Sequence, residues 1–96
     1  MEIKSTDNWI AKANYSDKKK SKLWISAYLQ NTNNYLEEEE LYERLNASVL
    51  FVNNEFSEIV WIAYNGKILI DYDNVDNKLK DMIVTSAINK AKEYMS

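Results

Sequence analysis

The pattern of apolar and polar positions is clearest in residues 58–72, EIVWIAYNGKILIDY. Two runs of β-favouring residues there flank Asn65 and Gly66, a pair that tolerates the positive φ angles of a two-residue type I′ turn. The stretch therefore predicts a β-hairpin. Counting outward from the turn pairs Tyr64 with Lys67, and the register of the remaining positions follows from that pair.

This register assigns the side chains of the hairpin to two faces, because successive residues of a strand point to opposite sides. One face carries only apolar and aromatic residues and is predicted to face the core: Ile59, Trp61, Ala63, Ile68, Ile70 and Tyr72. The opposite face carries two charged residues beside an apolar strip: Val60, Ile62, Tyr64 and Leu69. We expect an N-terminal hairpin of the chain, a second copy in a homodimer, or a partner to cover that strip, since open apolar surface favours association.

Two further stretches complete the second half of the chain. Residues 48–53, SVLFVN, are typical of a strand and predict a three-stranded antiparallel meander together with the hairpin. Residues 77–94 place most of their apolar side chains on one half of a helical wheel, and Asp76 can cap such a helix. We expect this helix to lie across the face that carries Trp61.

Residues 35–46 predict a second helix. Asn33 or Asn34 can cap it, and the glutamates at 37–40 would interact favourably with the N-terminal end of the helix dipole. On a helical wheel the tyrosines and leucines cluster on one side and the acidic residues on the other. The outer face of this helix is therefore expected to be acidic.

Residues 9–30 allow two interpretations. The stretch 22–30, KLWISAYLQ, favours a strand that pairs with 9–16 across a lysine-rich turn, with Leu23, Ile25, Ala27 and Leu29 on one face. The alternative is a helix after Ser16, but it would place lysines in its first turns, where the dipole disfavours them. With the hairpin, the order is β-β-α-β-β-β-α. The prediction is an α+β fold of residues 1–96, a single domain whose helices pack on one face of a small antiparallel sheet.

Composition narrows the classes of function. The chain contains no cysteine and no histidine, and it has one glycine. It therefore lacks a disulfide framework, the usual zinc ligands, the usual general base and any glycine-rich phosphate loop, so we predict a protein that is not an enzyme and has no cofactor or metal site. No apolar run approaches the roughly 20 residues of a membrane span, and the N-terminus does not resemble a signal peptide, so we expect a cytoplasmic protein.

Charge is unevenly distributed along the chain. Residues 35–77 hold ten acidic residues against Arg44 and Lys67, whereas lysines outnumber acids on either side. An acidic segment flanked by tyrosines is suited to a basic partner surface through steering and complementarity. The candidate partner-binding residues lie on the predicted helix: Tyr35, Glu37, Glu39, Glu40, Tyr42 and Glu43.

These features predict a non-catalytic module that binds a bacterial protein with a basic surface. The amino-acid composition is rich in Asn, Lys and Ile and includes a single Arg, as expected from an AT-rich coding sequence. It indicates a low-GC bacterium, a phage or a mobile element. In size, acidity and expected α+β class the chain is similar in type to anti-CRISPR and anti-restriction proteins. That similarity implies a stoichiometric inhibitor or an immunity-type protein.

A small nucleic-acid-binding or regulatory domain is the alternative function. Four lysines near the first turn can contact phosphates, and Trp24 or Tyr28 can stack on a base: Lys18, Lys19, Lys20 and Lys22. Lysines near a turn more commonly serve solubility, and a chain with one arginine offers little for base-specific contacts. Phosphate binding would weaken steeply with salt, which distinguishes it from an aromatic protein interface.

Overall fold

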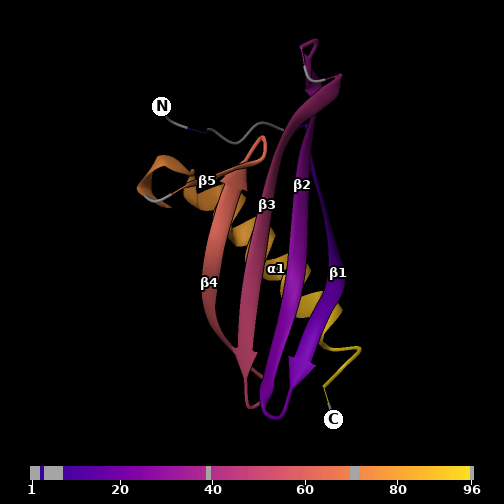
Figure 1. Cartoon of the computed structure of the whole chain (residues 1–96), viewed down its shortest axis with the longest axis vertical. Helices are drawn as coiled ribbons and strands as arrows, with labels where there is room; N and C mark the ends of the chain where they lie inside the picture. Colours follow the sequence, from indigo (N-terminus) through magenta and orange to yellow (C-terminus); the bar gives the residue numbers. More distant parts are fainter. Residues whose placement is uncertain (1–2, 4–7, 39, 70–71, 96) are drawn as a thin grey trace.

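The computed structural model describes residues 3, 8–38, 40–69 and 72–95. In this part of the chain, five strands form one antiparallel sheet in sequence order, and one α-helix follows them and lies behind the sheet in Figure 1. The elements are β1 Trp9–Lys19, β2 Lys22–Leu36, β3 Leu41–Val52, β4 Glu55–Tyr64, β5 Lys67–Leu69, the 3-10 turn η1 Tyr72–Asn74 and α1 Asn77–Ala91. The sheet makes the molecule elongated, with extents of 42 × 23 × 22 Å.

The first hairpin is confirmed, and it is longer than expected. β1 and β2 pair from Trp9↔Asn31 to Lys19↔Lys22, with a bulge after Tyr15. Lys20, at φ 56, forms the turn with Ser21. The predicted face of β2 is buried, and each of its residues pairs with a buried residue of β3: Leu23 with Phe51, Ile25 with Val49, Ala27 with Ala47 and Leu29 with Leu45.

The helix predicted at 35–46 is wrong, and so is the element order that contained it. Tyr35 and Leu36 end β2 and pair with Tyr42 and Leu41 at the start of β3. The strand predicted at 48–53 in fact begins at Leu41, because its alternation of buried residues continues backward through Leu45. Cross-strand pairing thus outweighs the favourable interaction of glutamates with a helix dipole. The observed order is β-β-β-β-β-α.

α1 confirms the predicted C-terminal helix and its cap. The Asp76 carboxylate accepts a hydrogen bond from the Lys78 amide at 2.9 Å, and the helix ends at Ala91. Its buried residues recur every four positions: Leu79, Ile83, Ala87 and Ala91. They pack against β1, β2 and β3, so the helix does not lie across the face that carries Trp61. Before the helix, Ile3 bridges to Val75 and accepts a hydrogen bond from the Asp76 amide.

A β-bulge explains why the predicted faces of β4 are wrong. The Asn65-Gly66 turn and the pairs Tyr64↔Lys67, Ala63↔Ile68 and Ile62↔Leu69 form as expected. Against β3, however, Trp61 pairs with Ser48 while Ile59 pairs with Val49, which leaves Val60 as an extra residue. Ile59 and Ile62 therefore both face the helix, and Trp61 is turned to the other side.

The remaining predicted core positions of this hairpin are also changed. Ile68 is 67% exposed rather than buried, and Ala63 is buried on the side away from the helix, where it pairs with Asn46. Tyr72 lies in η1, so it does not pair with Ile59. Ile70 lies outside the described residues.

Candidate functional site

The end of the β2–β3 hairpin projects beyond the rest of the sheet (Figure 1). We call residues Tyr35–Tyr42 the acidic tip. The pairing of β2 with β3 shifts after Asn31 and resumes at Tyr35↔Tyr42 and Leu36↔Leu41, and a short loop closes the hairpin. In that loop the amide of Glu40, at φ 52, donates to the carbonyl of Glu37 at 3.3 Å.

The acidic tip combines exposed aromatic and acidic side chains. Tyr35 and Tyr42 are 50% and 39% exposed, and their rings meet edge to face with centroids 5.3 Å apart. Glu37, Glu38 and Glu40 are exposed around them. Glu39, a predicted site residue, lies outside the described residues. The structure therefore brings four of the six predicted binding residues together, on a hairpin and not on a helix.

A surface hollow lies beside the acidic tip. It measures about 480 Å³ and is lined by Tyr35, Leu36, Glu37, Glu38 and Asn65. Asn65 belongs to the β4–β5 turn, so the hollow is formed where the tip passes that turn. An aromatic ring and two carboxylates around a concave surface match the chemistry of a Lys or Arg side chain. Sequence reasoning missed Glu38, although its neighbours were selected.

Glu43, the last predicted binding residue, has a structural environment. Its carboxylate accepts hydrogen bonds from the Tyr64 hydroxyl and from the Asn31 side chain, the latter at 3.0 Å. Burial raises the pKa of Tyr64 to about 12, and the neighbouring Glu43 adds to that rise. Asn31 is buried and also accepts from the Asn33 amide at 3.1 Å. Glu43 thus fixes the base of the projecting hairpin.

The side of the sheet away from α1 forms a second candidate surface, which we call the open face. No described element crosses it, and Figure 1 looks directly onto it. It presents three half-buried aromatic side chains around two serines that pair with each other: Trp24, Tyr28 and Trp61 around Ser26 and Ser48. The alternation of residues 22–30 predicted Trp24 and Tyr28 on this face, but the bulge concealed Trp61.

The apolar strip predicted as an alternative interface does not exist as one surface. Ile62 is fully buried on the face of the sheet that α1 covers. Tyr64 is half-buried on the same face and donates a hydrogen bond to Glu43. Val60 is 40% exposed at the bulge. The side chain of Leu69 lies outside the described part. The strip was expected from strict alternation, which the bulge interrupts.

The four lysines of the alternative nucleic-acid site do not converge. The Lys18 ammonium donates to the Tyr94 carbonyl at 3.0 Å, on the side of the sheet that α1 covers. Lys19 and Lys22 pair across the hairpin, next to the Trp24 row of the open face, while Lys20 occupies the turn. The cluster therefore divides between the two faces.

The described residues contain neither a metal-binding cluster nor a membrane-spanning helix. Among them, no group of three or more acidic residues is placed to hold a metal ion. No helix that they form is long and apolar enough to cross a bilayer. No protein-family model, no curated protein and no solved structure matches the chain.

Proposed function

We propose that the chain is a non-catalytic protein-binding module that inserts its acidic tip into a basic site of a partner protein. The carrying observation is the exposed Tyr35–Tyr42 pair, set among Glu37, Glu38 and Glu40 at the projecting end of a hairpin. The edge-to-face contact stabilises the hairpin, yet Tyr35 remains 50% and Tyr42 39% exposed, so both rings are accessible to a partner. Tyrosines in contact with a partner supply the large, rigid anchors that interfaces favour.

Charge determines the kind of partner. The tip carries three described glutamates. The residues that line the adjacent hollow include no lysine or arginine. Together with Tyr35, that hollow suits a Lys or Arg side chain of the partner, through a charge-assisted hydrogen bond and a cation–π contact. The glutamates would also steer association at long range. Binding of this kind blocks a basic functional cleft stoichiometrically and needs no catalytic group.

The open face extends the proposed interface. By strand alternation Tyr42 lies on the same face of β3 as Arg44. This is the open face, which continues from the tip to Tyr28 and the two tryptophans. Trp, Tyr and Arg are the residues that most often dominate binding energy at interfaces. The lysine cluster supports nucleic-acid binding less well, because Lys18 is engaged by the Tyr94 carbonyl.

Site-specific photo-crosslinking tests this proposal. A photoreactive phenylalanine analogue replaces Tyr42 in the tip or, as the control, Phe56, which is exposed to a similar extent at the opposite end of the sheet. We expect cross-links to a discrete partner from the tip position in lysates of plausible host bacteria, and none to the same protein from Phe56. Excess unlabelled wild-type chain should compete them away.

Matched charge reversals complete the test. The competitor Glu37→Lys/Glu40→Lys should lose most of its ability to compete, whereas Glu55→Lys/Glu58→Lys, with the same change in net charge at the far end of the sheet, should compete as the wild type does. The loss should be largest at low salt, where steering is strongest. Equal competition by the two variants would exclude the tip as the interface.

A further inference from the structure

The two edge strands of the sheet, β5 and β1, differ in length. At one edge β5 has three residues, which limits the backbone available for pairing. At the other, β1 has eleven residues, contains no proline, and has a strand neighbour on one side only within the described chain. Proteins normally shorten, charge or cover such edges, because exposed backbone groups recruit further strands. β1 has a bulge after Tyr15 and lysines at 18 and 19, but residues 9–15 pair regularly with β2 and include a single charged side chain, Lys12.

The hydrogen-bond pattern shows which backbone groups face outward from β1. The Thr32 amide donates to the Asn8 carbonyl at 3.2 Å, so Asn8 and Thr32 form a hydrogen-bonded pair. Such pairs alternate along an antiparallel ladder, so Lys12 also bonds to β2 while Ala11 and Ala13 direct their amides and carbonyls away from the sheet. At the centre of the regular part of β1 the outward groups thus belong to Ala11 and Ala13, whose minimal side chains allow close approach.

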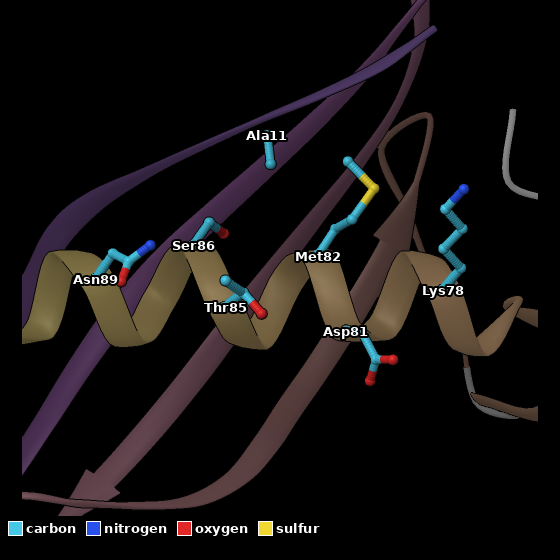
Figure 2. Close-up of a pocket in the computed structure, with 7 residues that line it drawn as sticks. All are labelled: Ala11, Lys78, Asp81, Met82, Thr85, Ser86 and Asn89. Carbon is cyan, nitrogen blue, oxygen red and sulfur yellow. The ribbon is translucent and has the colours of Figure 1, made fainter. Parts of the chain in front are cut away.

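A groove runs along this edge between β1 and α1. Its wider part measures about 350 Å³, and Figure 2 shows Met82 and Ser86 directed from the helix towards Ala11. A second hollow, of about 300 Å³, continues along Ala11 and Ala13. The groove closes where the Tyr15 ring packs on Tyr94 with centroids 4.8 Å apart. It therefore offers apolar space beside the outward backbone groups.

We propose that β1 pairs antiparallel with β1 of a second copy, and that Tyr15 of the partner subunit enters this groove. A twofold axis at Ala13 places Ala11 opposite the partner subunit's Tyr15, a small residue opposite a large one. It places Lys12 opposite Asn14 of the partner subunit, so no like charges oppose each other in the central rows. Tyr15 is 44% exposed in the single chain and would be covered in the pair.

Charges at the ends of the groove agree with this arrangement. Lys78 and Asp81 line one end, and Lys90 and Glu93 line the other. Each end holds one cation and one anion, and Lys90 pairs with Glu93 at 3.1 Å, so the two ends meet without net charge repulsion in the antiparallel dimer. The same symmetry directs the two acidic tips to opposite ends of the dimer. The dimer is independent of the proposed function, because β1 and the tip are separate surfaces.

Disulfide trapping tests the pairing, since the natural chain has no cysteine. In a hydrogen-bonded antiparallel pair the two Cα atoms lie about 5.5 Å apart, which a disulfide can span. Ala13→Cys should therefore form linked dimers in a glutathione buffer about 10-fold faster than the exposed control Ser57→Cys, because pairing raises the local thiol concentration. Cross-linking of Ala13→Cys no faster than of Ser57→Cys would overturn the proposal.

Sedimentation of the unmodified chain and of one variant gives a second readout. The wild type should sediment with twice the 11.3 kDa mass of the chain as its concentration rises towards about 1 mM. Ala13→Pro removes an outward amide that β2 does not use, so it should remain folded at this edge and sediment as a monomer. A wild type that stays monomeric throughout this range refutes the dimer, whether or not the proline variant folds.

Discussion

The face of the sheet beneath α1 and the open face differ in the side chains that they place at neighbouring positions of the same strands. In β2, Ile25 and Ala27 are completely buried, whereas Trp24 and Tyr28 beside them remain half-buried on the open face. The core thus consists mainly of aliphatic side chains, and the tryptophans of β2 and β4 lie outside it. Of the three tryptophans only Trp9 is buried in the core, where Phe51 is the largest fully buried side chain.

Alanine residues explain why α1 packs on the face of the sheet with the smaller side chains. Ala27 and Ala47 pair at the centre of the covered face and share one cluster with Ala87 of α1. Small residues let a helix approach a sheet closely, and the branched residues around them fill the remaining space. Ser26 and Ser48, one position along, form the corresponding centre of the open face. No helix of the described chain lies over that face, and the surrounding aromatic side chains remain half-buried.

Substitution of the two neighbouring residues that follow the β4 bulge should give the largest difference between the two faces of the sheet. Ile62 is fully buried, so Ile62→Ala should lower the free energy of unfolding by about 2–5 kcal/mol. Trp61 is half-buried on the open face, so Trp61→Ala should cost only roughly 1–2 kcal/mol although it removes a larger side chain. Urea denaturation of both variants measures the difference. A larger loss for Trp61→Ala would show that Trp61, and not Ile62, packs in the core.

Adding volume to the two faces should produce a smaller contrast. Ala47→Leu places a large side chain in a fully buried position beneath α1 and should cost about 1–3 kcal/mol through overpacking. Ser48→Leu, its neighbour on the open face, should change stability by less than about 0.5 kcal/mol. Thermal melts of the pair provide the comparison. Equal destabilisation would indicate that both faces are packed.

Local signals in the sequence predicted much of the fold. The Asn65-Gly66 turn, the first hairpin and the Asp76-capped helix depend on residues close together in the chain, and the structure contains all three. The bulge at Val60 depends on how β4 fits β3, which no local pattern reports. One extra residue inverted the faces of the hairpin, so the packing of α1 was predicted on the wrong side.

Most residues of the candidate site were predicted from the sequence, but their secondary structure was not. The acidic tip contains most of the selected tyrosines and glutamates, because the charge of this segment is visible in the sequence. Its helix was wrong because a capped, glutamate-rich segment satisfies helix rules, while the partner of Tyr35 across the hairpin is known only from the pairing of β2 and β3. The role of Glu43 was missed for the same reason, since Tyr64 lies 21 residues away.

The Tyr64–Glu43 hydrogen bond, at the border between the covered face and the tip, should produce the smallest effect. Tyr64→Phe removes it and should cost about 1 kcal/mol at neutral pH. The pKa of Tyr64 is raised in the folded protein, from 10.0 to about 12, so its stabilising contribution is complete below pH 10 and is lost as pH rises to 12.

The difference in melting temperature between the wild type and Tyr64→Phe should therefore shrink between pH 10 and pH 12. Tyr28→Phe removes a hydroxyl from the open face that donates to Gln30, and it controls for the general effect of alkali. Because both variants lose one phenol, charge repulsion from other ionised groups affects them equally. A difference that stays constant across this range would show that Tyr64 is not held in its neutral form by the fold.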